Sequence, residues 1–187
     1  MRIISGTARG AQLFAPKGMD TRPTTDKVKE SLFNMLQGEV PGATVLDLFA
    51  GSGGLSLEAL SRGADRAVLV DQSREAIGCI RRNVEKLRFG DRVQLLNCDW
   101  QQAVHRLSQE GTAFDLVFLD PPYRMDDLSP MCDTLLEKGL LMEDALIVWE
   151  RKSGSDKVLS PAFSLLKQRS YGEIEICFYR YAKEDDQ

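Results

Sequence analysis

Strand-like and helix-like patterns alternate between residues 44 and 149, and this alternation constrains the fold more than any other feature of the chain. Short runs rich in β-branched and aromatic residues predict buried strands, and apolar residues at helical spacing predict helices. The predicted strands are 44–49, 67–71, 92–97, 114–119 and 145–149, and the predicted helices between them are 55–62, 74–87, 100–107 and 128–137. This order predicts an α/β fold: a Rossmann-like, doubly wound, mostly parallel sheet with helices on both faces.

The two ends of the chain follow other patterns. Residues 164–170 and 173–181 read as strands joined by a tight link, which predicts an antiparallel hairpin at the sheet edge. Residues 2–5 and 12–15 predict a small N-terminal β-hairpin, and a helix is expected from residue 24 or 25 to residue 36. We therefore expect an arm and loop over residues 1–23 and a single domain over residues 24–187.

The residue inventory excludes several kinds of chemistry. The four cysteines form no C-x-x-C pair and His105 is the single histidine, so a zinc site or a Ser–His–Asp triad is not expected, and we predict no metal. No apolar stretch is long enough to span a bilayer, and residues 1–6 lack the apolar core of a signal peptide, which predicts a cytoplasmic location. Any chemistry must then use carboxylates, backbone groups and a bound cofactor.

The sequence Asp120-Pro121-Pro122-Tyr123 follows the predicted strand 114–119. Neither proline has an N–H for the ladder and each fixes its φ, so the strand ends abruptly in a stiff loop. In open α/β sheets, ligands bind at this carboxyl end of the strands. A turn with a capping Asp and a packing Tyr is the simpler alternative for the loop alone.

A second candidate site follows the first predicted strand, where the chain reads Gly51-Ser52-Gly53-Gly54 before a helix. Glycines let the backbone turn tightly and approach a ligand closely. Asp71, twenty residues after Gly51, ends the second strand and can accept the hydroxyls of a ribose. The predicted cofactor-binding residues are Asp47, Phe49, Gly51, Ser52, Gly53, Asp71, Gln72, Asp99 and Trp100.

Two cofactors fit a glycine-rich turn of this kind: a dinucleotide and S-adenosylmethionine. Ser56 occupies the third glycine position of the G-x-G-x-x-G pattern, which weakens the dinucleotide interpretation. Asp47 would repel a pyrophosphate but attract an ammonium group, and Asp99 can accept from an adenine amine beside Trp100. These features favour S-adenosylmethionine.

The motifs of residues 49–53, Asp71 and residues 120–123 resemble the signatures of amino-directed S-adenosylmethionine methyltransferases. Residues 2–6, 9–10, 21–24 and several positions from 27 to 34 resemble one branch of these enzymes, the RsmD family. This resemblance implies methylation of the exocyclic N2 amine of a guanine in bacterial small-subunit (16S) ribosomal RNA, either free or in the assembled small subunit, by a monomer. Ala11 and Gln12 depart from the family, whose members often carry basic residues after the Arg-Gly pair.

The resemblance also implies roles for the loop and the arm. Asp120 and the Pro121 carbonyl would accept the hydrogens of the target amine, Pro122 would stiffen the loop, and Tyr123 would stack on the base. Residues 1–29 carry a charge of +4 and the rest of the chain −8. This arm is either a solvated segment or a phosphate-binding one, and its candidate RNA contacts are Arg2, Arg9, Arg22 and Lys27.

Three other functions remain open from the sequence. A DNA adenine-N6 methyltransferase could use the same loop, although no separate DNA-reading domain is evident. Protein-glutamine methyltransferases more often carry Asn-Pro-Pro-Tyr, which Asp120 does not match. A non-catalytic RNA-binding assembly factor could keep the fold, and cofactor titration would distinguish it.

Overall fold

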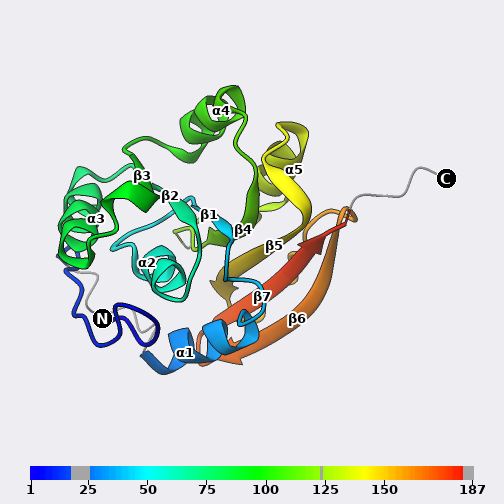
Figure 1. Ribbon diagram of the computed structural model, residues 1–187. Helices are drawn as coiled ribbons and strands as arrows, with labels where there is room; N and C mark the ends of the chain where they lie inside the picture. The colour runs from blue at the N-terminus through cyan, green and yellow to red at the C-terminus, as the bar shows by residue number, and fades with distance from the viewer. Residues whose placement is uncertain (18–25, 123, 183–187) are drawn as a thin grey trace.

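The computed structural model describes residues 1–17, 26–122 and 124–182, and Figure 1 shows the arrangement of its elements. The helices are α1 (Asp26–Met35), α2 (Gly54–Ser61), α3 (Arg74–Leu87), the short 3-10 turn η1 (Gly90–Arg92), α4 (Trp100–Glu110) and α5 (Ser129–Glu137). The strands are β1 (Thr44–Asp47), β2 (Arg66–Val70), β3 (Val93–Leu96), β4 (Phe114–Leu119), β5 (Leu141–Lys152), β6 (Phe163–Tyr171) and β7 (Ile174–Tyr181). No helix within the described ranges has the length and apolar character needed to cross a membrane.

The strands form one sheet in the order β3-β2-β1-β4-β5-β7-β6. The first five in this order are parallel, and β7 pairs antiparallel with both β5 and β6. The predicted mostly parallel α/β sheet with an antiparallel C-terminal hairpin is confirmed. The order of the two hairpin strands was not predicted from the sequence. The later strand, β7, lies next to β5, and β6 forms the edge of the sheet.

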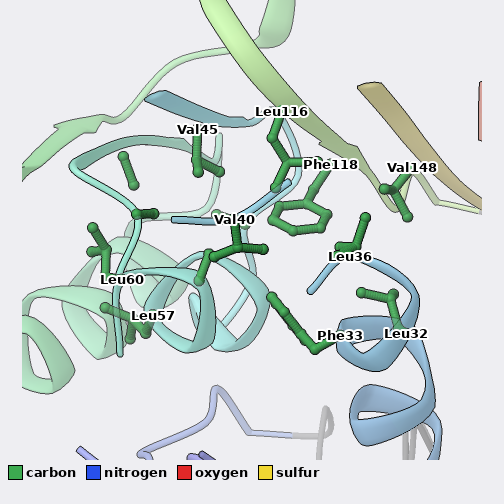
Figure 2. Close-up of a cluster of buried hydrophobic side chains, with 14 of the residues drawn as sticks. Leu32, Phe33, Leu36, Val40, Val45, Leu57, Leu60, Leu116, Phe118 and Val148 are labelled. Atoms are coloured by element: carbon green, nitrogen blue, oxygen red, sulfur yellow. The ribbon is translucent and has the colours of Figure 1, made fainter. Parts of the chain in front are cut away.

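Helices cover both faces of the sheet. Side chains of α1, α2 and α3 share one apolar cluster on the first face, and side chains of α4 and α5 share a second cluster on the other. Figure 2 shows the first cluster, where Leu32, Phe33 and Leu36 pack near Phe118 and Val148. Leu32 and Phe33 of α1 and Leu36, which follows its last residue, were expected to be core residues, and all three are buried.

The N-terminal residues pair as a short hairpin, though with less regular structure than predicted. An isolated antiparallel bridge joins Arg2 and Gln12, and the Ile3 N–H donates to the Ala11 carbonyl at 2.9 Å. Regular strands do not form over 2–5 and 12–15, because the rest of the segment bonds to the body of the domain instead. Ile3 is fully buried in the first core cluster, so this segment is part of the packed structure.

Candidate active site

The turn between β1 and α2 needs its glycines. Gly51 and Gly53 have φ values of 57° and 81°, in the left-handed region that side chains disfavour. A Cβ at Gly53 would also approach a Leu69 methyl carbon to 3.1 Å. The turn therefore presents bare backbone at the carboxyl end of β1, and the Gly51 N–H donates to an Asp71 carboxylate oxygen at 2.9 Å.

A cavity of about 350 Å³, named here the Trp100 cavity, lies at the carboxyl ends of the strands. Its lining includes seven of the predicted site residues: Phe49, Asp71, Gln72, Asp99, Trp100, Asp120 and Pro122. Leu48, Cys98, Arg124 and Met125 also line the cavity, and closeness to the proline loop is the only sequence signal that points to Arg124 and Met125. Residues from four different strand ends thus meet around one space.

Asp71 and Asp99, two of the acidic side chains that line the Trp100 cavity, also have structural roles. The Asp71 carboxylate accepts from the backbone N–H groups of Gly51 and Ser73, and Asp99 caps α4 by accepting from the Gln102 N–H at 2.9 Å. A carboxylate has about four acceptor sites, so these bonds leave capacity for ligand hydroxyl or amine groups. The capping interpretation and the ligand interpretation are therefore compatible.

A second cavity of about 90 Å³, named here the Lys29 cavity, adjoins the first. Asp47, Phe49, Gly51, Ser52 and Asp120 line it, as do Met1, Ala15 and Lys29. Phe49 and Asp120 border both cavities and form the wall between them. A single ligand could place its nucleoside part in one cavity and its amino-acid part in the other, with its middle beside Phe49 and Asp120.

Asp47 and Asp120 both line the Lys29 cavity, and the more deeply buried of the two is Asp47. Its side chain is 3% exposed and accepts from the Ser56 hydroxyl at 3.0 Å. Burial raises the pKa of Asp47 to about 7, with a further increase from the nearby Asp120, while the Ser56 bond opposes the increase. A cation placed beside Asp47 would favour its ionised form.

Lys29 is the site residue that the sequence reasoning missed. Its side chain is 2% exposed, lies 3.3 Å from the fully buried Glu58 carboxylate, and donates to the Arg2 carbonyl. Burial lowers the pKa of Lys29, and Glu58 opposes that decrease. The available signal was its position beside Val28 on the apolar stripe of α1, where a lysine must be paired if it is buried.

Three of the four predicted RNA contacts lie among the described residues. Arg2 pairs with Asp26 at 2.7 Å, while Arg9 and Lys27 are exposed. Arg22 and the predicted catalytic residue Tyr123 lie outside the described residues. Across 1–17, 26–122 and 124–182, no group of three or more His, Cys, Asp or Glu side chains is positioned to hold a metal ion.

The donor set fits S-adenosylmethionine better than a dinucleotide. Carboxylates at the ends of β2 and β3 suit ribose hydroxyls and an adenine amine, and Trp100 offers an aromatic surface beside them. The amino-acid end would lie near Asp47, whose buried carboxylate complements an ammonium group and opposes a pyrophosphate.

Comparison with known proteins shows similarity along nearly the whole chain. The family model described as "Conserved hypothetical protein 95" matches residues 1–180. "Ribosomal RNA small subunit methyltransferase D" of Escherichia coli (strain K12) is 37% identical over 181 residues, covering 96% of this chain and 89% of that protein. "Putative rRNA methyltransferase YlbH" of Bacillus subtilis (strain 168) is 44% identical over 150 residues, covering 80% of this chain and 82% of that protein.

Solved structures show the same fold. The Escherichia coli structure described as "Putative methyltransferase yhhF" has a TM-score of 0.85 at 36% identity, covering 97% of this chain and 98% of that one. An RNA methyltransferase from Salinibacter ruber, in complex with S-adenosyl-L-homocysteine, has a TM-score of 0.66 at 15% identity, covering 89% of this chain and 97% of that one. At that identity the likeness shows the fold alone.

Proposed function

The chain belongs to the RsmD family, and on this basis we propose that it transfers a methyl group from S-adenosylmethionine to the exocyclic N2 amine of a guanine in bacterial small-subunit (16S) ribosomal RNA. The observation that carries the proposal is the position of Asp120. This carboxylate borders both the Trp100 cavity and the Lys29 cavity, at the place where the two parts of one cofactor would join.

The cofactor is proposed to lie across the two cavities. Asp71 and Gln72 hold the ribose, Asp99 and Trp100 the adenine, and Asp47 the ammonium group, while Gly51, Ser52 and Gly53 offer backbone at close range. S-adenosylmethionine supplies an electrophilic methyl group on a sulfonium. Phe49, which lines both cavities, would separate the two ends of the ligand and exclude water between them.

Asp120 and the proline loop act on the target amine. The lone pair of a guanine amine is delocalised into the ring, so the amine is a poor nucleophile. Asp120 and the Pro121 carbonyl accept its two hydrogens and favour a pyramidal nitrogen whose lone pair is available to the methyl carbon. As the N–C bond forms and the C–S bond breaks, the nitrogen loses a proton to Asp120 or to water.

Pro121 and Pro122 hold these acceptors at a fixed angle to the strand ends. Both prolines have a locked φ, so little ordering is needed when the base enters. Tyr123 is proposed to stack on the base, a contact worth roughly 1–3 kcal/mol. Together these groups orient the base without a metal ion.

The target must be accessible to this loop. An amine in a paired helix lies in the groove, so the substrate is proposed to be an unpaired or flipped-out guanine in structured RNA, free or in the assembled small subunit. Arg2, Arg9, Arg22 and Lys27 remain the proposed phosphate contacts. Of these, Arg2, Arg9 and Lys27 are exposed side chains, as such contacts require.

The experiment that tests this function uses labelled S-adenosylmethionine and small ribosomal subunits from cells that lack the endogenous activity. Digestion of the RNA and nucleoside analysis should yield labelled N2-methylguanosine at one nucleotide. Label in N6-methyladenosine, or cofactor binding without any label in RNA or subunits, would contradict the proposal. Naked RNA run in parallel identifies which form is the substrate.

A further inference from the structure

A second acidic residue, Glu150, lies beside Asp120 on the neighbouring strand. β4 and β5 are parallel, and Leu119 pairs with Trp149 in their register. The next residues along the two strands are Asp120 and Glu150, and neighbouring strands are about 4.8 Å apart. The same two residues line a third cavity of about 40 Å³, named here the Glu150 cavity, with Pro121 and Lys152 also in its wall.

The alternation along β5 gives the direction of the Glu150 side chain. Val148 faces α1 and packs near Phe118 in the first core cluster (Figure 2). Successive side chains of a strand alternate between faces, so Glu150 and Lys152 lie on the same face as Val148. This is also the face of α1, which contributes Lys29 to the cavity that Asp120 borders. Glu150 is partly buried, as expected for a group that meets the edge of a ligand.

A second carboxylate beside Asp120 would bind guanine in preference to adenine, because the two bases present different hydrogen-bonding groups. Guanine presents hydrogen-bond donors at both the N2 amine and the adjacent ring N1, followed by an acceptor at O6. Adenine has an acceptor at N1, next to its N6 amine. An ionised carboxylate only accepts hydrogen bonds, so it would attract the guanine N1–H and repel the adenine N1 lone pair.

We propose that Glu150 is a specificity-determining residue that accepts the N1–H of guanine while Asp120 accepts from the N2 amine. The Lys152 ammonium, on the same face one alternation further along β5, donates to O6. This inference rests on the proposed function and extends it, because it names the group that selects guanine over adenine at the same amine-directed loop. The small volume of the Glu150 cavity suits the edge of a base, while the ring itself lies outside it.

2-Aminopurine tests this assignment directly. It keeps the reacting amine of guanine but has an acceptor instead of a donor at N1 and lacks O6. The nucleotide methylated in the subunit assay is first mapped, and small subunits are then reconstituted with guanine or 2-aminopurine at that position. Single-turnover methyl transfer is measured for the unaltered chain and for Glu150→Gln, whose amide N–H can donate to the 2-aminopurine N1.

The unaltered chain should prefer guanine over 2-aminopurine by about 10- to 100-fold, since a hydrogen bond to a charged group is lost and an acceptor is left facing an acceptor. Glu150→Gln should raise the rate on 2-aminopurine relative to guanine and so reduce the preference, while the part of the preference that comes from the Lys152–O6 hydrogen bond remains. Glu150→Ala, which removes the acceptor but adds no donor, should lower the guanine rate without raising the 2-aminopurine rate.

Glu143→Gln is the matched control, because Glu143 is an exposed glutamate near the opposite end of the same strand. It should leave the preference unchanged, and calorimetric titration with S-adenosylmethionine should show that every variant binds the cofactor. An unchanged guanine preference in Glu150→Gln would overturn the assignment of Glu150 alone. Failure of the unaltered chain to form N2-methylguanosine would instead overturn the proposed function.

Discussion

At the scale of single residues, the protonation of Asp47 affects both the stability of the fold and the affinity for the cofactor, in opposite directions. Its carboxylate is buried, with the Ser56 hydroxyl as a hydrogen-bond donor. Burial raises its pKa from 3.8 to about 7, so the folded chain binds this proton more tightly than the unfolded chain does. The stability that the bound proton contributes is complete below pH 3.8 and is lost as the pH rises to about 7.

This pKa predicts a pH-dependent affinity for S-adenosylmethionine. Above pH 7 the Asp47 carboxylate is ionised and attracts the ammonium group, and below pH 7 it is protonated. The association constant should rise several-fold between pH 6 and pH 7.5 as the ionised fraction of Asp47 rises, because above that range the α-amino group of the ligand, with an ordinary pKa of about 7.7–8.0, begins to lose its own proton. Calorimetric titration across this range checks the result.

Asp47→Asn is the control for that titration. It should bind the cofactor more weakly at pH 8 and lose the pH dependence, while its unfolding temperature at pH 8 should exceed that of the unaltered chain by about 2–8 °C. A pH-dependent affinity that persists in Asp47→Asn would assign the titration to another group.

At the scale of elements, a buried ion pair fastens the N-terminal segment to the body. Lys29 of α1 and Glu58 of α2 lie 3.3 Å apart, and the Glu58 carboxylate accepts from the backbone N–H groups of Ile4 and Ser5. Lys29 in turn donates to the Arg2 carbonyl. The pair therefore sets where the segment runs, and the segment supplies Met1 and Ala15 to the wall of the Lys29 cavity.

Breaking this pair should destabilise the fold and loosen the segment. Lys29→Met removes one of the two cations that pair with the buried Glu58 carboxylate and leaves Arg62, 2.8 Å away, as the other, so we expect a loss below the roughly 3–5 kcal/mol typical of breaking a buried ion pair. Chemical unfolding measures the loss, and amide exchange at Ile4 and Ser5 should accelerate more than exchange in β4. The double variant Lys29→Met/Glu58→Gln should lose less than the two single variants combined. Additive losses would show that the two side chains act independently.

At the scale of the whole molecule, the alternating pattern was enough to predict the class of the sheet. The predicted ranges 74–87 and 114–119 coincide with α3 and β4. β5 runs from Leu141 to Lys152 where 145–149 was expected, because Leu141 pairs with Phe114 of β4 at one end and residues 150–152 pair with β7 at the other. Those pairings join distant parts of the chain, and periodicity within a segment carries no record of them.

Part of the candidate site, like part of the fold, was predictable from the sequence. Strand ends of a parallel sheet share one edge, so the aspartates at those ends could be brought together from sequence alone. The Lys29–Glu58 pair could not be predicted from the sequence, because it depends on how α1 packs against α2. The lining of the Lys29 cavity by Met1 and Ala15 depends on the same packing.

The charge of the N-terminal segment makes a prediction for RNA binding by the whole protein. Arg9→Ala and Lys27→Ala should each weaken binding to small-subunit RNA and lower the slope of log affinity against log salt by about one. Lys138→Ala, a change of an exposed lysine at the end of α5, is the matched control and should leave the slope unchanged. Filter binding at several salt concentrations gives the slopes. Equal slopes for all variants would show that Arg9 and Lys27 do not contact the RNA.

The central claim is that the Asp120 carboxylate acts on the amine of the substrate and is not needed to hold the cofactor. The most direct measurement is single-turnover methyl transfer by Asp120→Ala and Asp120→Asn on small subunits, paired with calorimetric titration of each variant with S-adenosylmethionine. The account predicts that transfer by Asp120→Ala falls below detection while its cofactor affinity stays within about threefold of the unaltered chain. Methyl transfer at the full rate in Asp120→Ala would contradict it.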